Sequence, residues 1–396
     1  MESGDQYGPA LPPGDTNVVS QLNRVTLHNC APMDLSNEAN FNALLAQPDQ
    51  EFYPWLASIG LVGSAQTFRC PTCGGACKFV PRANRRLCFT FRCRNSKNHE
   101  FSLTKFSFFE KIKVDVRVLL RFVRGYLLSA FLDDSANGAG IVGNVRLDWV
   151  SVTRDIFVEV VRRSLNGVRF HKEVEINDAL VGTITVDGRS IVHNVWLFGV
   201  THTETSQVLL FPVLARDEVT VVRILQRFVD PGAKVVAEPG SFYSRIDFRC
   251  CGFEGVVRTP LQTVRNSRVW AHTKAHFCKF AESTKLFSFE SLVCEIIWRS
   301  WKRGDLFTNY LSDLKSIYTL RGPPQFTSNA RPIFDTWVSS EEYASCNFNF
   351  SFMDSVSQTT LLSSKVLTAS SEHEGSEGRA SSSYAHITTC IIGHTQ

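Results

Sequence analysis

The chain has 396 residues, of which 43% are hydrophobic, 20% charged and 11% aromatic. This composition excludes a globally disordered chain, which would be poorer in apolar residues and richer in charge. No apolar run approaches the roughly 18 residues that a membrane-spanning helix needs, and the N-terminal segment lacks the pattern of a secretory signal. We therefore expect an intracellular protein that is neither secreted nor membrane-spanning. Its 12 cysteines are then thiols or metal ligands rather than disulfides.

Basic residues are concentrated in one window of the sequence. Residues 66–126 contain 14 Lys and Arg against 3 Asp and Glu, a net charge of +11 in a chain whose total is +4. The remainder of the chain therefore carries a net charge of −7. A compact basic module on a mildly acidic body favours a polyanion as partner, and a solvated basic surface is the alternative reading.

The N-terminal half divides into segments of different composition. Residues 1–35 contain the turn-rich stretch GPALPPGD and predict a disordered leader. Residues 36–66 predict one or two short helices, and residues 67–110 form a small cysteine-rich module. Residues 111–168 predict two helices separated by a glycine-containing break, SANGAG.

The two helices of residues 111–168 allow two interpretations. The second helix is expected from Val145 to Leu165, with Ile156, Val160 and Val161 on its inner face. The segment from Gly140 onward could be a helix-turn-helix, which presents its second helix to the major groove of DNA. A plain connecting pair of helices would show the same pattern.

The pattern changes to strands in residues 169–322. Three strands follow one another from Phe170, with short polar connections at 181–190 and 203–206 that are typical of antiparallel hairpins. A helix over 217–229 with an acidic first turn, a short buried strand, AKVVAE, and a helix over 287–303 come next. This order predicts a mixed α/β sheet with helices packed on it.

The C-terminal segment, residues 323–396, is expected to be irregular to disordered. Residues 351–396 contain 17 Ser and Thr among 46 residues, with the polar run EHEGSEGRASSS in the middle.

The most specific local signal is the motif CPTCGG, which begins at Cys70. Two thiolates separated by two residues on a glycine turn give half of a tetrahedral zinc site, and the stretch FRCRNSKNHEF can supply the other half. The resulting closed Cys₃His site would consist of Cys70, Cys73, Cys93 and His99. Cys77 and Cys88 are alternative members of the second pair. Zinc would then supply much of the folding energy of this small module.

Basic side chains surround the predicted zinc module and suit phosphate contact better than base recognition. These side chains are Arg82, Arg85, Arg86, Arg92, Arg94 and Lys97. We expect a salt-dependent affinity for duplex DNA, centred on residues 66–165.

Several stretches in chain order resemble one family of proteins. After the CPTCGG module, SLTKFSFFEK resembles the family pattern S-L-R-x-G-T-x-F-F-E without its glycine, and FGVTHTET resembles the end of the strand after the first catalytic strand. PGAKVVAEPGSFY resembles P-G-x-x-I-x-x-D-G-x-x-x-Y, and CEIIWRSWKR resembles I-E-x-x-W-x-x-x-K-R. The matching residues are Ser102, Leu103, Phe108, Phe109, Glu110, Pro231, Gly232, Tyr243, Glu295, Trp298, Lys302 and Arg303.

Over roughly residues 40–320, the chain resembles the Merlin-class transposases and their bacterial insertion-sequence relatives. The resemblance implies a DDE integrase domain of ribonuclease H-like fold at 169–322, preceded by a zinc ribbon and a helix-turn-helix-like segment. It also implies double-stranded DNA as the partner and assembly into a homo-oligomer. The DNA partner suggests a nuclear location.

The family's reaction, cleavage and transfer of DNA strands, needs three carboxylates that hold two Mg²⁺ ions. The resemblance places the first acid on Asn177, the second on Glu238 and the third on Glu295. An amide is neutral and bridges two dications poorly, while Glu238 keeps the charge of the usual Asp but is one methylene longer. Asp178 would need a β-bulge to replace Asn177, because neighbouring strand residues point to opposite faces.

Glu295 lies on a helix face with Arg299 and Lys302, which are candidate DNA contacts. The substitutions at 177 and 238 favour a transposase-derived DNA-binding protein in which strand transfer is weak or lost. An active DDE transposase and a zinc-ribbon transcription accessory protein are the alternatives.

Overall fold

The computed structural model describes residues 34–82, 89–128, 132–141, 145–186, 192–259, 269–273, 277, 286–324, 326 and 346–354. Most of the predicted leader and tail, and also Arg85, Arg86 and Cys88, lie outside these ranges. The chain divides into two compact units, residues 1–352 and 353–396. The helices and almost all of the two sheets belong to the first unit.

Two short helices open the described chain, as the sequence predicted. α2 (Glu38–Leu45) begins after Asn37, whose side chain accepts hydrogen bonds from the backbone N–H groups of Ala39 and Asn40. α3 (Asp49–Ser58) follows and buries Phe52 and its neighbours. Both helices are too short to be stable alone, so their packing decides their stability.

The cysteine-rich module is a small antiparallel sheet. It contains β1 (Cys77–Pro81), β2 (Phe89–Cys93) and β3 (Glu100–Ser102), in the order β1-β2-β3. Phe68 stacks on Phe91 with ring centroids 4.1 Å apart, and Phe79 packs on Phe91 at 4.9 Å. The module therefore has an aromatic core of its own in addition to its cysteines.

Three helices follow the module, where the sequence predicted two. They are α4 (Val116–Leu128), α5 (Leu132–Gly138) and α6 (Val145–Leu165). The prediction of a break at SANGAG was wrong for its first four residues, which belong to α5. Two glycines made the stretch look like a loop, but the second one, Gly140, has a positive φ of 70° and follows the helix end. Of the predicted inner face of α6, Ile156 and Val161 are fully buried.

The larger sheet confirms the predicted mixed α/β class. Its strands are β4 (Glu173–Val186), β5 (Val192–His202), β6 (Val208–Val213), β7 (Lys234–Ala237) and β8 (Glu254–Val257). Their order is β6-β5-β4-β7-β8; β9 (Cys346–Asp354), inside the segment expected to be irregular, also pairs with β4. β4, β5 and β6 pair antiparallel, whereas β7 is parallel to β4 and β8 is parallel to β7.

The polar connection predicted for 181–190 was partly wrong, because β4 continues through Val186. The stretch Thr183–Val186 is made of β-branched residues, which fit a pleated strand even where the run is polar. A register shift between Leu180 and Gly182 keeps β4 paired with β5 along this extension.

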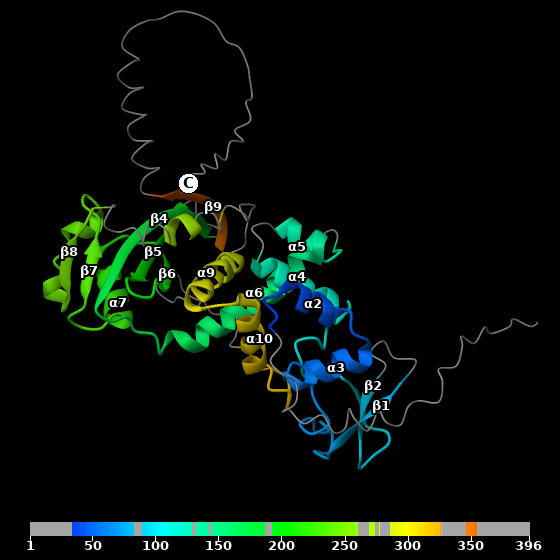
Figure 1. Ribbon diagram of the computed structural model, residues 1–396. Coiled ribbons are helices and arrows are strands. Elements are labelled where there is room, and N and C mark those ends of the chain that lie inside the picture. Colours follow the sequence, from blue (N-terminus) through cyan, green and yellow to red (C-terminus); the bar gives the residue numbers. More distant parts are fainter. Residues whose placement is uncertain are drawn as a thin grey trace, which may run out of the picture. The chain divides into compact units, whose positions relative to one another are not determined.

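Helices cover the larger sheet and connect it to the N-terminal half (Figure 1). α7 (Glu218–Phe228) begins at Asp217, whose side chain accepts the N–H of Thr220, and Phe228 packs on Phe211 of β6. α9 (Leu286–Trp301) lies between β6 and α6, and α10 (Leu306–Ile317) contacts α4 and α6. Two short 3₁₀ helices precede β8: η1 (Phe242–Arg245) and η2 (Phe248–Cys251).

Arg117 on α4 holds the loop between α2 and α3. Its guanidinium donates hydrogen bonds to the carbonyl oxygens of Leu45 at 3.0 Å and Gln47 at 2.8 Å, and it pairs with Asp49 at 2.9 Å. The guanidinium also lies 4.1 Å from the centre of the Phe52 ring. Charged donors of this kind make stronger hydrogen bonds than neutral ones.

Arg124, two helical turns after Arg117, holds the start of the described chain. It donates to the carbonyl oxygens of Leu35 at 3.3 Å and Ser36 at 2.9 Å, and it lies 4.9 Å from the centre of the Phe41 ring. The two arginines therefore fix the N-terminal helices to α4.

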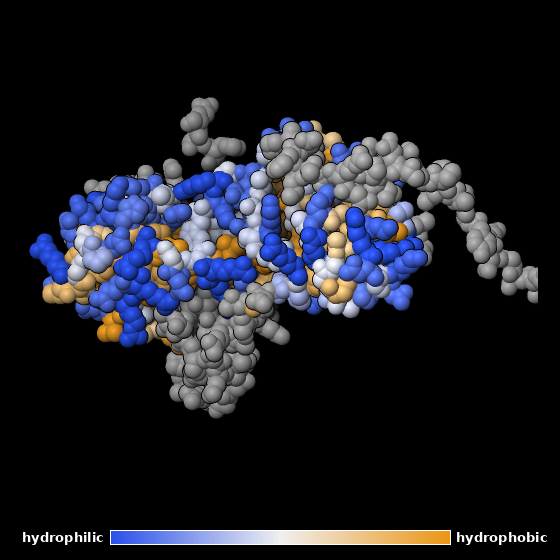
Figure 2. Space-filling model, turned by 90° about the horizontal axis from the view of Figure 1, so that it is seen from below, coloured by the Kyte–Doolittle hydropathy of each residue, from blue (hydrophilic) through white to orange (hydrophobic). Residues whose placement is uncertain are grey.

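On the face that Figure 2 presents, hydrophobic residues occur in separate areas among hydrophilic ones. Large apolar side chains that are exposed include Leu128, Val145, Leu147 and Val152 on α4 and α6. Within the described parts of the chain, no helix combines the length and the apolar character needed to cross a membrane.

Candidate metal centre and polar residues of the central sheet

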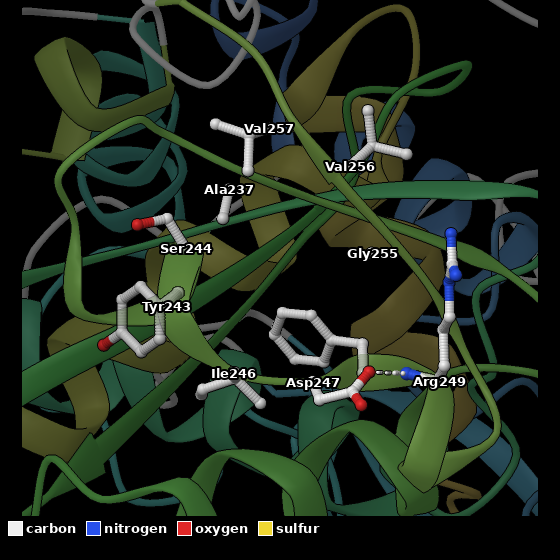
Figure 3. Close-up of a pocket in the computed structure, with 10 residues that line it drawn as sticks. Ala237, Tyr243, Ser244, Ile246, Asp247, Arg249, Gly255, Val256 and Val257 are labelled. Carbon is white, nitrogen blue, oxygen red and sulfur yellow. Dashed lines mark hydrogen bonds between the residues drawn. The ribbon is translucent and has the colours of Figure 1, made fainter.

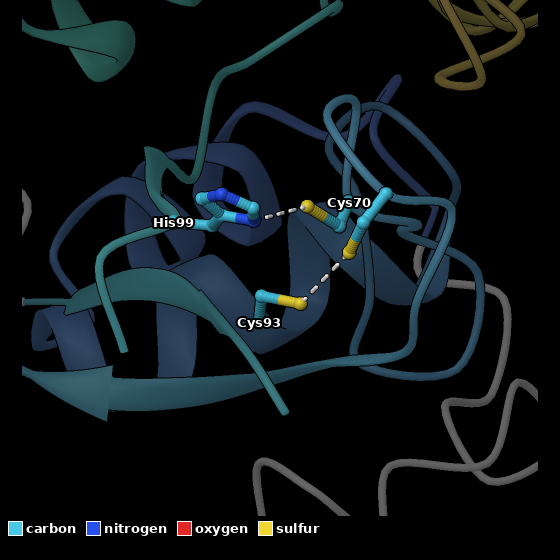
Figure 4. Close-up of side chains that lie close together, drawn as sticks. Cys70, Cys93 and His99 are labelled. Atoms are coloured by element: carbon cyan, nitrogen blue, oxygen red, sulfur yellow. Dashed lines mark hydrogen bonds between the residues drawn. The ribbon is translucent and has the colours of Figure 1, made fainter. Parts of the chain in front are cut away.

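The four predicted ligands of the cysteine-rich module come together. The ligand atoms of Cys70, Cys73, Cys93 and His99 all lie within 4.8 Å of one another. Cys70 Sγ is 3.4 Å from His99 Nδ1, and Cys73 Sγ is 3.4 Å from Cys93 Sγ (Figure 4). A tetrahedral zinc ion with Zn–S bonds of about 2.3 Å would need ligand separations of about 3.5–3.8 Å. The cluster can therefore hold a metal such as zinc, and the predicted ligand set is confirmed as a cluster.

The backbone on both sides of the cluster is shaped to bring the thiols together. Gly74 has a φ of 70°, and its N–H donates to the carbonyl oxygen of Cys70 at 2.8 Å. On the other side, the N–H of Asn95 points to the sulfur of Cys93 at 3.4 Å. The Asn95 side chain packs closely on Gly75, so that a Cβ there would lie 2.6 Å from Asn95 Nδ2 and this side chain would have to move.

Two cysteines of the module have opposite environments. Burial raises the pKa of the Cys70 thiol, but the N–H groups of Cys73 and Thr72 and the neighbouring thiols outweigh burial and lower the pKa to about 6. Burial raises the pKa of Cys77 to about 11. A metal binds the thiolate, so the surroundings of Cys70 suit this role. Cys77, an alternative in the sequence, is outside the cluster of four.

The predicted DNA-contacting side chains of the module fall into two groups. Arg82 forms a bidentate ion pair with Glu100, at 2.8 and 2.6 Å, and Arg92 contacts the same carboxylate at 3.3 Å. Arg94 and Lys97 are exposed, and they lie in the segment between the ligands Cys93 and His99. The side chains of Arg94 and Lys97 are therefore the ones that present their charge to solvent.

Asn177 and Asp178, neighbours on β4, have different surroundings. Asn177 is half-buried, pairs with Gly199 of β5 across the ladder, and accepts the N–H of Asp178 on its side-chain oxygen at 2.8 Å. Asp178 is only 3% exposed; it accepts the hydroxyl of Tyr243 at 2.5 Å and pairs with Arg216 at 2.5 Å.

The surroundings of Asp178 make it a structural acid. Burial raises the pKa of its carboxyl group, and the contacts with Tyr243 and Arg216 counteract this rise. Arg216 also stacks over the ring of Trp196, with 4.6 Å from its central carbon to the ring centre. Asp178 is therefore committed to this group of side chains. Sequence reasoning identified Tyr243 as a family match but did not find its partner or Arg216.

Asn177 lies on β4, and Glu238 directly follows β7, the parallel neighbour of β4. The last parallel pair between β4 and β7 is Glu175↔Val236. Glu238 is half-buried and follows β7 directly, where its carbonyl oxygen accepts the hydroxyl of Ser241 at 2.6 Å. Two of the three positions that the family resemblance singled out therefore lie two residues after the Glu175↔Val236 pair, one on each side of it.

Trp270 lies against the strand position opposite Asn177. A Cβ on Gly199 would be 2.8 Å from Cζ2 of this indole, so glycine is what allows the ring to approach the sheet. Trp270 is 8% exposed, and its buried ring N–H has no hydrogen-bond partner among the described residues.

Glu295 is fully buried, and its contacts come from three helices. Oε2 accepts the hydroxyl of Tyr126 on α4 at 2.5 Å and Nε of Arg154 on α6 at 3.0 Å. Oε1 accepts Nε of Arg299, one turn further along α9, at 2.9 Å. Two guanidinium groups and a phenol therefore surround this carboxylate, and its assignment as a catalytic acid stays a prediction.

The two basic residues predicted to contact DNA, Arg299 on α9 and Lys302 directly after it, are engaged in contacts within the protein. Arg299 donates to the carbonyl oxygens of Leu127 and Tyr126, at 2.9 and 3.3 Å. Lys302 pairs with Asp313 of α10 at 2.8 Å, and the indole N–H of Trp298 donates to the same carboxylate at 2.7 Å. Their family match is therefore accounted for by packing between α9, α10 and α4, and a role in binding DNA stays a prediction.

A pocket of about 130 Å³ lies between η1, η2 and the strands β7 and β8. Its lining includes Tyr243, Asp247 and Arg249, with the carboxylate of Asp247 accepting the N–H of Arg249 at 3.1 Å (Figure 3). None of the residues predicted as catalytic or metal-binding lines this pocket.

Comparison with known proteins adds no family to these observations. The sequence matches no protein-family model, and no curated protein is significantly similar to it.

Proposed function

We propose that this chain is a DNA-binding protein derived from an insertion-sequence-type DDE transposase, in which DNA cleavage and strand transfer are weak or lost. The proposal includes a ribonuclease H-like domain at residues 169–322 and a zinc ribbon at residues 67–110. A protein of this kind would act on double-stranded DNA, as a homo-oligomer and in the nucleus.

The strand order of the larger sheet supports the ribonuclease H-like domain. An antiparallel meander, β4-β5-β6, is followed by a helix and then by two strands that add parallel on the other side of β4. This is the order of the ribonuclease H-like fold. A parallel connection through a helix is also the usual way for a chain to cross from one side of such a sheet to the other.

The positions of Asn177 and Glu238 support descent from a DDE enzyme. The family places one acid on the central strand and another directly after the next parallel strand, and each of these positions here lies two residues after the parallel pair Glu175↔Val236. The chemistry at these positions has changed, because the central one is neutral. Two magnesium ions held close together need a shared carboxylate, which an amide replaces poorly.

The burial of Glu295 is the observation that carries the loss of catalysis. A carboxylate that ligates Mg²⁺ must present oxygens to an open site, whereas the oxygens of Glu295 accept hydrogen bonds from Tyr126, Arg154 and Arg299. Releasing it would take the carboxylate away from the buried guanidinium of Arg154, which is energetically unfavourable. The third position of the family site is therefore used for helix packing.

DNA binding is supported by the module around the Cys₃His cluster. Arg94 and Lys97 are exposed between two of the four ligands, so a bound metal would hold their backbone in place. Exposed basic side chains on a fixed loop contribute to DNA affinity through phosphate contacts and the release of counterions.

The test compares the full chain with its Asn177→Asp variant. Binding of duplex DNA is measured by fluorescence anisotropy, and nicking and strand transfer are measured on plasmid DNA with Mg²⁺ or Mn²⁺. We expect salt-dependent binding by both proteins and no DNA cleavage by the wild type. Weak cleavage that appears only in Asn177→Asp would identify a degenerate catalytic site.

Two results would contradict the proposal. Metal-dependent cleavage by the wild type that is abolished in Glu238→Gln would establish an active transposase. Absence of any preference for duplex DNA over an acidic control polymer at low salt would remove the DNA-binding function. Glu238→Gln is preferred to a Glu295 variant because Glu238 is half-buried at a strand end, whereas removal of Glu295 disturbs packing.

A further inference from the structure

A second group of metal-binding side chains lies at one end of β4 and β5, away from the cysteine-rich module. His171 comes two residues before β4, His202 is the last residue of β5, and Glu204 is in the turn that leads to β6. One ligand atom from each of the three lies within 4.8 Å of the other two. The rings of His171 and His202 have centroids 4.8 Å apart.

The hydrogen bonds of the His202 ring are those expected of a histidine that binds a metal ion. The ring is 1% exposed, and Nε2 is 3.0 Å from the carbonyl oxygen of His171, so this nitrogen donates. Nδ1 then carries the lone pair, which faces the hydroxyl of Thr205 at 2.8 Å and accepts the N–H of Thr205 at 3.3 Å. A histidine that binds metal through one nitrogen and donates to a backbone carbonyl through the other is the usual arrangement.

The turn after β5 fixes Glu204 close to the two histidines. The N–H of Ser206 donates to the carbonyl oxygen of His202 at 2.8 Å, and the N–H of Thr203 donates to that of Glu173 at 3.2 Å. Glu204 is exposed, and its Oε1 pairs with Lys172 at 2.7 Å. The pair with Lys172 engages one carboxylate oxygen and places a competing cation beside the three side chains.

We propose that His171, His202 and Glu204 bind a divalent transition-metal ion, with zinc as the best match. Two imidazoles and one carboxylate are a common set of three protein ligands for zinc, and the fourth position is left to water. The ion would replace the Thr205 hydroxyl at Nδ1 of His202 and the Lys172 ammonium at Glu204. The site shares no residue with the Cys₃His cluster and does not depend on DNA binding.

The experiment titrates the full chain with Zn²⁺ by calorimetry after the tightly bound metal of the Cys₃His cluster has been measured. Wild type is expected to take up one further equivalent. His171→Ala and Glu204→Gln each remove an exposed ligand, so the fold should be retained and the affinity for this equivalent should fall by about tenfold or more. His272→Ala is the matched control, since His272 is also exposed, and it should bind as the wild type does.

A third variant changes the affinity in the opposite direction. Lys172 has a positive φ of 60°, which asparagine also tolerates, so Lys172→Asn removes the competing cation without straining the backbone. It should bind the further equivalent more tightly than wild type, an effect that damage to the fold would not produce. Uptake of no further zinc by the wild type, or uptake that is unchanged in His171→Ala and Glu204→Gln, would overturn the proposal. If Lys172→Asn binds this zinc equally well or more weakly than the wild type, Glu204 is not a ligand.

Discussion

Arg154 on α6 and Glu295 on α9 form an ion pair, with 3.0 Å between Nε and Oε2, in a region where Glu295 has no exposure to solvent. Residues 141 positions apart in sequence are thereby joined at the junction of α4, α6 and α9. A buried pair of this kind is costly to break, because the partner that remains is a buried charge without compensation.

Glu295→Ala is therefore expected to lower the free energy of unfolding by about 3–5 kcal/mol, because Arg154 is left in the buried region. Urea denaturation followed by circular dichroism measures the change. The control is Glu254→Ala, which removes an exposed pair with Lys234 at 3.9 Å and should cost less than about 1 kcal/mol. Equal effects of the two substitutions would show that the pair of Arg154 with Glu295 is not a buried one.

The Cys₃His cluster leads to a prediction about metal content. Purified wild type is expected to retain about one zinc per chain after exhaustive dialysis, and Cys73→Ser should lose most of it because one of the four ligands is gone. Cys77→Ala should retain the metal, since its sulfur is outside the cluster of four ligands. Elemental analysis measures the zinc content of each variant. Loss of zinc from Cys77→Ala would show that Cys77 is a ligand and that the assigned set of four is wrong.

The exposed residues Arg94 and Lys97 give a prediction for salt dependence. The double variant Arg94→Ala, Lys97→Ala should bind duplex DNA more weakly and should reduce the slope of log affinity against log salt by about 2, since each phosphate contact contributes about 0.9. Anisotropy titrations over a range of salt concentrations measure this slope. Lys234→Ala, at an exposed position of β7, should leave the slope unchanged. A slope that is the same in the double variant would place the DNA contacts elsewhere.

Asp155 on α6 predicts a dependence of stability on pH. Burial raises the pKa of its carboxyl group to about 6, from an ordinary value of 3.8. A raised pKa means that the folded protein binds the proton more tightly than the unfolded chain does. This contribution to stability is complete below the ordinary pKa and is lost as the pH rises through about 6, so it is absent at neutral pH.

Asp155→Asn should therefore be more stable than wild type at neutral pH, by no more than about 3 kcal/mol, and the advantage should shrink toward about pH 4. The free energy of unfolding is measured for both proteins across this range. Asp148→Asn, at an exposed position on the same helix, is the control for the substitution itself. An advantage for Asp155→Asn that does not vary with pH would have a cause other than titration.

Local patterns in the sequence were sufficient to predict much of the fold. The spacing of the cysteines in CPTCGG predicted half of the metal cluster, and the acidic start at Asp217 predicted the beginning of α7, which Asp217 caps. These features involve residues close together in sequence, where turn geometry and helical period leave few alternatives. The extension of β4 was missed because a polar run of β-branched residues was interpreted as a loop.

The side-chain contacts of the predicted catalytic residues could not be predicted from local sequence patterns. Helical period placed Arg299 one turn after Glu295, and that contact is present. The contacts of Glu295 with Tyr126 and Arg154, and that of Asp178 with Tyr243, depend on how distant segments pack. A pattern of residue types along one segment carries no information about such partners. A catalytic acid and a structural acid therefore look alike in the sequence.

The attachment of the first two helices to α4 determines where the protein can be cut. Arg117 and Arg124 together donate to four carbonyl oxygens between Leu35 and Gln47. A truncated version that starts at residue 66 would leave both guanidinium groups without these acceptors. The shortest fragment suitable for crystallisation or for DNA-binding assays should therefore begin before Leu35, even though the charge pattern alone would place its start after the second helix.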